Sequence, residues 1–130
     1  MPKYDTFGVI LGIFSNFPER IAEYRHDREK MHAFFYKNKS KYAVLSGFAF
    51  DTDGLTPFSP QINSSYDTLE VSRLVCSRSL DFDIHRVDTA ACRIGFDKFH
   101  KKKFSKSKIA EMKKLSEEFR KEFSLESVLQ

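Results

Sequence analysis

The most suggestive chemical pattern in the sequence is an alternation of Asp81, Asp83 and His85. Alternate residues of a β-strand lie on one face, so a strand would place the two carboxylates and the imidazole side by side. Such a set can bind Mg²⁺ or Mn²⁺ and support phosphodiester chemistry. The solvent-facing side of a half-buried strand produces the same alternation, and we prefer that interpretation to a metal site.

Other groups of potential ligands are weaker. The pairs Glu23 with His26 and Glu29 with His32 have the i, i+3 spacing of di-iron helical bundles. Their starting positions are about 240° apart around a helix, so one metal ion could not use both pairs. The segment 51–62 begins like a calcium loop but lacks its closing Glu. No nucleophile stands near a suitable base in the sequence, so we expect no enzyme, no cofactor and no metal.

The two cysteines, Cys76 and Cys92, stand alone. Neither has another Cys or a His at metal-ligand spacing, so we expect reduced, buried thiols, which are typical of a cytoplasmic protein. The first residues lack the basic start and apolar stretch of a secretory signal. No apolar run approaches the roughly 20 residues of a membrane span, so we expect a cytoplasmic protein that is not in the membrane.

The 130 residues (15.2 kDa) suffice for one domain, which we expect to span residues 1–130 around a single core. Hydrophobic residues make up 41% and charged residues 31%, which excludes the disordered and collagen-like classes. The chain has 14 Phe and 5 Tyr but no Trp. Because Phe has no polar group, this composition predicts core packing before ligand stacking.

Positive charge is concentrated near the end of the chain. Residues 98–130 carry 10 Lys or Arg against 5 Asp or Glu, whereas residues 1–97 carry 12 against 13. The most basic stretch is 98–108, where Phe99, His100 and Phe104 interleave with lysines. Basic stretches with interleaved aromatic residues are common in nucleic-acid-binding proteins, although a solvated surface has the same composition.

Apolar periodicity predicts four helices. A helical stripe runs through 7–14, although Val9 and Ile13 would also fit a strand, and an amphipathic helix is expected over 18–37. A third helix is expected over 60–75, because Ser59 is a favourable cap and Pro at the next position suits a first turn. The last stripe predicts a C-terminal amphipathic helix over 105–123.

Between these helices the pattern is extended or irregular. The apolar stretch 42–50 fits either a strand or a short helix, and the Pro- and Gly-containing stretch 51–60 predicts a loop. Alternation over 80–85 and again over 92–96 predicts a β-hairpin. We expect 98–108 to be a basic connecting segment between the hairpin and the last helix.

The expected order is therefore helix, helix, helix, β-hairpin and C-terminal helix, an α+β fold that is mainly helical. A capped helix followed directly by a hairpin is the outline of a winged-helix domain. In such a domain the helix 60–75 would be the recognition helix and the hairpin would be the wing.

Three segments resemble a known family. The run Phe48–Ser59, followed by Ile62, Leu69 and Leu74, resembles the winged-helix block of the Panacea family, which includes SocA-like antitoxins and small regulators. The segments Arg28–Phe35 and Phe119–Leu129 are similar to the preceding and closing helical segments of that family. The resemblance implies a winged-helix regulator that acts on a protein partner.

Taken together, these features predict a winged-helix DNA-binding regulatory protein with no enzymatic activity. Polar side chains on the recognition helix would meet base edges, while cations elsewhere would contact phosphates. The expected nucleic-acid-binding residues are Gln61, Asn63, Ser64, Thr68, Arg73, Arg86, Arg93, Lys98, Lys101, Lys102, Lys103 and Lys106.

An alternative is an antitoxin-like or adaptor protein that binds a protein partner without contacting DNA. Asp67 and Glu70 on the third helix would repel phosphates, which favours this alternative. Leu125, Val128 and Leu129 form an apolar edge near the end of the chain and are the expected partner-binding residues. The C-terminal helix could also join two copies in a homodimer.

Overall fold

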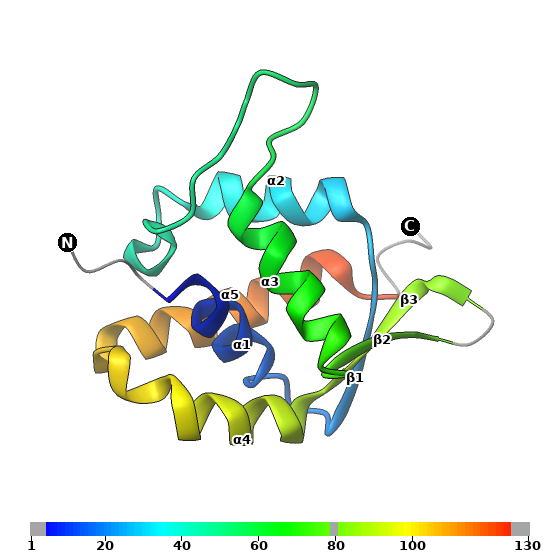
Figure 1. Cartoon of the computed structure of the whole chain (residues 1–130), viewed down its shortest axis with the longest axis vertical. Coiled ribbons are helices and arrows are strands. Elements are labelled where there is room, and N and C mark those ends of the chain that lie inside the picture. The colour runs from blue at the N-terminus through cyan, green and yellow to red at the C-terminus, as the bar shows by residue number, and fades with distance from the viewer. Residues whose placement is uncertain (1–4, 79–80, 126–130) are drawn as a thin grey trace.

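The computed structural model describes residues 5–78 and 81–125, which form a mainly helical α+β structure (Figure 1). Its α-helices are α1 (Thr6–Phe14), α2 (Arg28–Asn38), α3 (Pro60–Val71), α4 (Thr89–Phe99) and α5 (Lys106–Phe123). Short 3₁₀ turns lie at η1 (Ala43–Leu45) and η2 (Lys101–Lys103). The strands β1 (Ile21–Arg25), β2 (Val75–Arg78) and β3 (Asp81–Asp88) form an antiparallel sheet in the order β1-β3-β2.

Each α-helix begins at a polar side chain that caps it. The capping oxygen accepts a hydrogen bond from a backbone amide in the first turn, which satisfies one of the amides that a helix start leaves without a partner. The capping residues are Asp5, Asp27, Ser59, Asp88 and Ser105. These local signals explain why three of the predicted helices are confirmed as α1, α3 and α5.

The third helix is shorter than the expected 60–75. It ends at Val71, and Arg73 then adopts a positive φ of 62°. A residue in this left-handed region cannot continue a right-handed helix. The chain turns there and enters β2 at Val75.

The predicted helix over 18–37 is wrong before Arg28. Residues Ile21–Arg25 form β1, in which Ala22 and Tyr24 are buried and pair with Val87 and His85 of β3. A segment this short fits both the two-residue period of a strand and the 3.6-residue period of a helix. Its pairing with the distant strand β3 makes it a strand. The helix α2 begins only after the Asp27 cap.

The predicted hairpin is also displaced. The hairpin is made of β2 and β3, and residues 92–96 lie in α4 instead of in a second strand. Cys92 and Phe96 are buried while Ile94 is 68% exposed, as expected for positions i, i+4 and i+2 of a helix. Asp88 caps this helix, which begins at Thr89.

The stretch 42–50 is neither a strand nor a continuous helix. It contains the turn η1 and then leads into a loop, as predicted over 51–60. We call residues 47–59 the arm, because they project from the body of the molecule (Figure 1). A single β-bridge between Asp51 and Phe58 closes the arm, and Leu55 near its tip is fully exposed.

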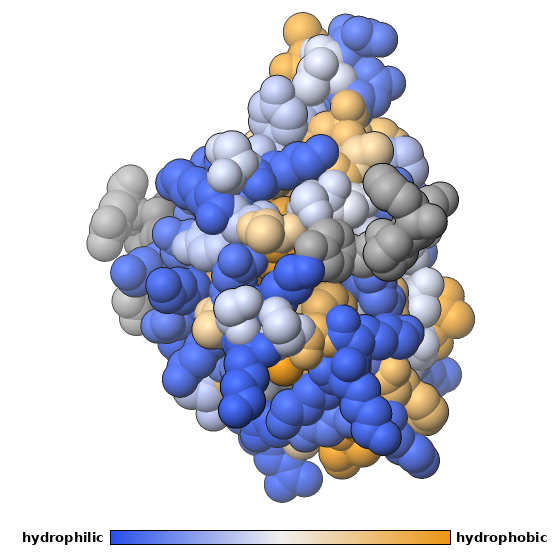
Figure 2. Space-filling view, turned by 90° about the vertical axis from the view of Figure 1, so that its left-hand side faces the viewer, coloured by the Kyte–Doolittle hydropathy of each residue, from blue (hydrophilic) through white to orange (hydrophobic). Residues whose placement is uncertain are grey.

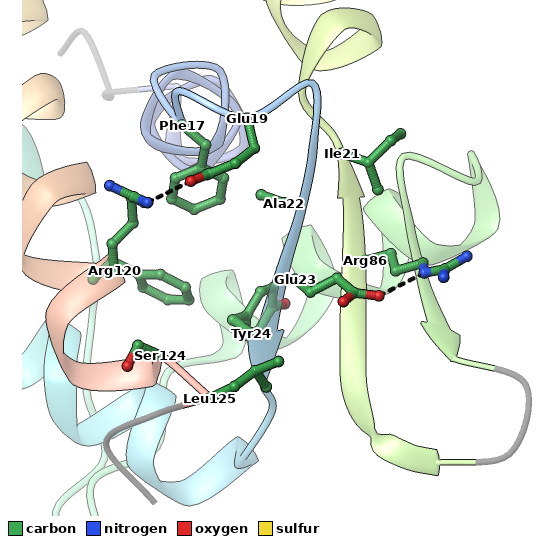
Figure 3. Close-up of a pocket in the computed structure, with 11 residues that line it drawn as sticks. Phe17, Glu19, Ile21, Ala22, Glu23, Tyr24, Arg86, Arg120, Ser124 and Leu125 are labelled. Atoms are coloured by element: carbon green, nitrogen blue, oxygen red, sulfur yellow. Dashed lines mark hydrogen bonds and ion pairs between the residues drawn. The ribbon is translucent and has the colours of Figure 1, made fainter.

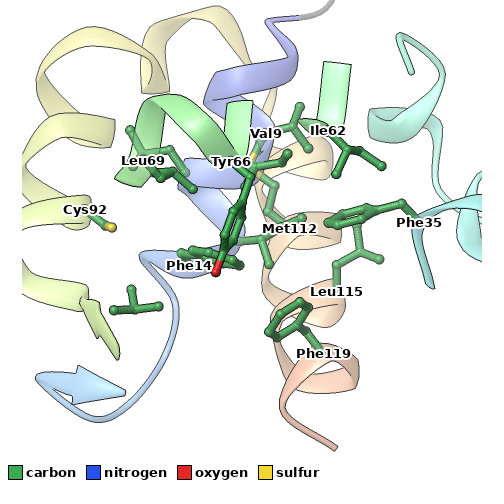
Figure 4. Close-up of a cluster of buried hydrophobic side chains, with 14 of the residues drawn as sticks. Val9, Phe14, Phe35, Ile62, Tyr66, Leu69, Cys92, Met112, Leu115 and Phe119 are labelled. Atoms are coloured by element: carbon green, nitrogen blue, oxygen red, sulfur yellow. The ribbon is translucent and has the colours of Figure 1, made fainter. Parts of the chain in front are cut away.

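The core is built around α1, whose residues Val9, Ile10, Ile13 and Phe14 are almost completely buried. Side chains from α2, α3, α4 and α5 converge on it (Figure 4). As the composition predicts, phenylalanines fill much of this core: Phe14, Phe17, Phe34, Phe35, Phe48, Phe119 and Phe123 are fully buried. The apolar stripe of α5 therefore packs inside its own chain.

None of the helices in 5–78 and 81–125 combines the length and the apolar composition needed to cross a bilayer.

Candidate functional site

The strongest concentration of exposed charge lies where α4 ends and α5 begins. We call this region the lysine corner; its members are Lys98, Lys101, Lys102, Lys103, Lys106 and Lys108. The stretch 98–108 contains no acidic residue. It was expected to be a connecting segment after a strand, but most of it belongs to α4, η2 and α5. The structure thus brings five of the predicted nucleic-acid-binding residues together.

Asp5 anchors the lysine corner to α1. Its carboxylate accepts hydrogen bonds from the Gly8 amide (2.9 Å) and from Lys103 Nζ (3.1 Å), and it pairs with Nδ1 of His100. Partial burial acts to raise the pKa of Asp5, but these three donors outweigh it and hold that pKa below its usual value. Phe104 reinforces the anchor by packing on Phe96, with ring centroids 6.1 Å apart.

This scaffold leaves the charged groups at the surface. Lys98, Lys101, Lys102 and Lys106 are exposed, and Phe99 beside them is 63% exposed. The Nζ atom of Lys98 lies 5.3 Å from the centroid of the Phe99 ring. The side of the molecule that carries the corner is largely hydrophilic in its lower half (Figure 2). The backbone is thus held in place while Lys98, Lys101, Lys102 and Lys106 remain exposed.

The residues of α3 that were predicted to contact bases have a different environment. The Gln61 side-chain oxygen accepts from the Ala49 amide and from Ser59 Oγ, both at 3.0 Å, and so ties the arm to α3. Asn63 accepts from Arg28 at 2.7 Å, which joins α3 to α2. The side chains of these two predicted base contacts thus form hydrogen bonds within the protein.

Further along α3, the outward surface is polar and acidic. Thr68 Oγ1 donates to the Ser64 carbonyl within the helix at 2.9 Å, and both residues are exposed. Asp67 and Glu70 are exposed beside them. Burial, and then the Asp67 charge, raise the pKa of Glu70. Arg73, beyond the helix end, is the first cation after Pro60.

Two of the three predicted arginine contacts, Arg86 and Arg93, already have partners. Arg86 on β3 forms an ion pair with Glu23 on β1, with Nε and Oε2 2.8 Å apart. Arg93 was expected on the wing, but it lies in α4. There its Nε and Nη2 donate to the Ser15 carbonyl at 3.2 and 3.0 Å, which caps the end of α1.

The predicted contacts therefore do not form one cluster. The hairpin of β2 and β3 projects to the right in Figure 1, whereas η2 and the start of α5 lie on the left. Five lysines gather at one corner, four polar residues lie on α3, and Arg86 lies on the sheet.

The predicted partner surface is only in part described. Leu125 lines a cavity of about 560 Å³ beside β1, together with residues of β1 and of the end of α5 (Figure 3). Val128 and Leu129 lie outside the described residues. The cavity is larger than a hollow of about 200 Å³ beside Lys37 and Glu118.

A buried polar cluster was missed at the level of sequence. The Tyr66 hydroxyl forms hydrogen bonds with the Tyr24 hydroxyl and with Nδ1 of His85, and His26 stacks on the Tyr66 ring. Tyr24 lies in β1, His26 directly follows β1, Tyr66 lies in α3 and His85 lies in β3. Alternating Tyr24 and His26 would have signalled this cluster only if β1 had been recognised as a strand.

Of the Asp81, Asp83 and His85 pattern, the side chain of Asp81 lies outside the described residues, and those of Asp83 and His85 do not converge. His85 is directed to Tyr66 in the core, while Asp83 pairs with Arg25 at the surface, 3.7 Å away. Within the ranges that the structure describes, no three His, Cys, Asp or Glu side chains are arranged to hold an ion. Of the cysteines, Cys92 is buried as expected and Cys76 is exposed. Burial, with a smaller effect of Asp88, raises the pKa of Cys92 to about 12.

No protein-family model matches this chain, and no curated protein or solved structure is significantly similar to it.

Proposed function

We propose that this protein is a winged-helix domain that binds nucleic acid mainly through the phosphate backbone, with the lysine corner as its grip. The order of elements supports the first part: a helix, a strand, two helices and a hairpin, with β1 beside β3 in the sheet. This order is similar to that of a winged helix, in which α3 would take the place of the recognition helix and β2–β3 that of the wing.

The observation that carries the binding proposal is the lysine corner itself. Six lysines lie within 98–108 without an acidic neighbour in that stretch, on a backbone fixed by Asp5 and Phe104. Phosphate contacts need positive charge at a defined place and carry no sequence information. The corner therefore fits general affinity for nucleic acid, and Phe99 supplies an exposed ring among the cations.

The helix α3 supports a smaller role than the sequence suggested. It carries no Lys or Arg, it exposes Asp67 and Glu70, and two of its polar side chains are used within the fold. Acidic groups facing a phosphate backbone repel it. We therefore assign affinity to the corner and at most a weak sequence preference to Ser64 and Thr68.

A salt titration tests the proposal. Fluorescence anisotropy of a labelled random duplex, titrated with the protein between about 50 and 200 mM salt, should give micromolar binding and a log–log slope of about −4 to −5 if four to six lysines contact phosphates. The triple variant K101E, K102E and K106E changes three exposed lysines of the corner, leaves the Lys103–Asp5 contact in place, and should abolish binding. The matched control is K113E, K114E and K121E, which makes the same charge change at exposed positions of α5.

The outcomes discriminate clearly. Equal loss of affinity in both triple variants would mean that only the total charge matters, which contradicts a defined grip. An unchanged affinity in the corner variant would remove the corner from the interface altogether. Loss of affinity on changing Ser64 and Thr68 to Ala, with the corner variant unaffected, would return α3 to the central role.

A second candidate is the adaptor suggested by the resemblance to SocA-like antitoxins. It is favoured by the acidic outer surface of α3 and by the fully exposed Leu55 on the arm. Folded protein that fails to bind duplex at 50 mM salt would favour this candidate over nucleic-acid binding.

A further inference from the structure

The last residue of α4, Phe99, exposes its aromatic ring within the lysine corner. Phe99 is 63% exposed, whereas Tyr36 and Phe58 are 46% and 42% exposed. Tyr36 and Phe58 each pack on another ring, with centroids 5.3 and 4.9 Å apart. In the part of the chain that the structure describes, no other aromatic ring packs on Phe99. The ring is therefore open to a ligand.

The exposure of Phe99 differs from what its place in the helix predicts. Cys92, Phe96 and Phe99 stand at positions i, i+4 and i+7 of α4, which lie on one face of a helix. Cys92 and Phe96 are buried, with 0% and 4% of their surface exposed. Phe99 continues this stripe at the end of the helix but stays in contact with water. Burial of an aromatic ring is favourable, so a flat ligand that covers Phe99 is stabilised there.

Exposed lysines flank this ring. The Nζ atom of Lys98 lies 5.3 Å from its centroid, and the turn η2, which carries Lys101 and Lys102, begins two residues after Phe99. All three lysines are exposed. The nearest acidic residue in the sequence, Asp97, stands two positions before Phe99 and so lies about 200° around the helix from it. A ligand that covers the ring therefore meets positive charge beside it.

The chemistry of Phe determines which form of nucleic acid it can bind. Phe has no hydrogen-bonding group, so Phe99 adds affinity only by packing on a base and not by contacting a phosphate. Inside a duplex the bases are stacked on one another, and their flat faces are covered. In a single strand the bases are free to stack on aromatic side chains. A flat exposed ring beside cations is the combination that single-strand-binding proteins use.

We propose that the lysine corner selects single-stranded nucleic acid, with one base stacked on the ring of Phe99 and the adjoining phosphates bound by Lys98, Lys101 and Lys102. This inference rests on the proposed function, because it names the form of nucleic acid that the corner takes. The phosphate contacts supply affinity that salt weakens. The stacked base supplies affinity that tolerates any sequence, because every base has a flat face.

Two single strands separate the base from the phosphates. One strand has about 12 thymidines, within the usual site sizes, and the other is an abasic strand of the same length and charge. In fluorescence anisotropy, the unmodified chain should bind the thymidine strand about 5- to 150-fold more tightly than the abasic strand. Phe99→Ala should remove this preference and leave the affinity for duplex unchanged. Ile94→Ala, which truncates a side chain of α4 that is 68% exposed, should keep the preference.

Phe99→Trp gives a direct signal of stacking, because the chain has no other Trp. The thymidine strand should quench the Trp fluorescence, and the abasic strand should not, since only a base can stack on the indole. Ile94→Trp on the same helix is the control and should show no quenching. A uridine strand, tested in the same way, distinguishes RNA from DNA as the source of the base. Quenching by either strand supports the proposal, and quenching by neither overturns it.

Failure of this inference can be told apart from failure of the proposed function. Duplex binding that the triple lysine variant abolishes, together with equal binding of the thymidine and abasic strands, would overturn the inference alone. Equal weakening of duplex and thymidine strand by Phe99→Ala would overturn it too, because the ring would then not select single strands. If neither duplex nor single strand binds at about 50 mM salt, the proposed function fails and the inference fails with it.

Discussion

The imidazole ring of His26 lies flat against that of His85, with ring centroids 4.1 Å apart and an angle of 16° between the planes. His26 also stacks on the ring of Tyr66, with the ring centroids 4.9 Å apart. Burial is the main reason that the pKa of His26 falls to about 4, and the charges of His85 and Arg28 act in the same direction against the weaker effect of Asp27. The folded protein thus keeps His26 neutral.

Acid should therefore weaken the fold through His26. Between about pH 6.5 and pH 4 the unfolded chain binds a proton at this residue and the folded chain does not, so the free energy of unfolding falls as the pH falls. The loss is on the order of 1 kcal/mol once the partial exposure of the ring is allowed for. Urea unfolding at pH 7 and at pH 4.5 measures it.

The variant His26→Phe isolates this effect. Nδ1 of His26 has no hydrogen-bond partner among the described residues, so a phenyl ring keeps the stacking without losing a bond at that atom. The variant should lose less stability between pH 7 and pH 4.5 than the unmodified chain. Burial, and then the charge of Arg28, also lower the pKa of His32. In the variant, His32 should therefore still cause a smaller loss of stability as the pH falls. An identical pH dependence in both proteins would contradict the assignment to His26.

Tyr66→Phe should destabilise the protein by about 1 to 3 kcal/mol, because it removes a buried hydroxyl that bonds to both Tyr24 and His85. Chemical denaturation measures the change. The comparison is Tyr42→Phe, which removes only a long hydrogen bond of 3.4 Å to Glu118 and should cost less than about 1 kcal/mol. Equal effects of the two substitutions would mean that the buried hydroxyl network adds no stability.

Gly12→Ala should destabilise the protein by about 1 to 3 kcal/mol, since the new methyl group would lie 2.4 Å from Sδ of Met112 and 2.8 Å from the ring of Phe96. Gly95→Ala is the matched change in α4. Its methyl group would have ordinary contact with Leu11 at 3.7 Å, so the better helix propensity of Ala should stabilise the protein by about 0.5 to 1 kcal/mol. Thermal unfolding should shift in opposite directions; a shift in the same direction would show that α1 is not packed closely on α4 and α5.

Arg93→Ala separates a capping role from a phosphate contact. The side chain donates two hydrogen bonds to the Ser15 carbonyl at the end of α1, and its loss should cost about 1 kcal/mol of stability. The salt dependence of duplex binding should stay the same as in the unmodified chain. A shallower salt slope with unchanged stability would instead make Arg93 a phosphate contact, as the sequence suggested.

Local signals in the sequence were sufficient for much of the helical structure. The helices α1, α3 and α5 combine a capping side chain with an apolar stripe, and both features lie within one segment of chain. The lysine corner was also visible, because its residues are neighbours in the sequence. The strand β1 was not, since five residues such as Ile21–Arg25 fit more than one period.

The sequence by itself thus determined where α1, α3 and α5 begin, the phenylalanine-rich core and the basic segment. Only the tertiary structure decided that Tyr24 pairs with His85, that Arg93 caps α1 away from the wing, and that the lysines lie far from the hairpin. The physical reason is that caps and periodicity act between near neighbours along the chain, whereas strand pairing and side-chain contacts join residues distant in the sequence. The spacing of apolar residues does not show which distant residue pairs with a given strand residue.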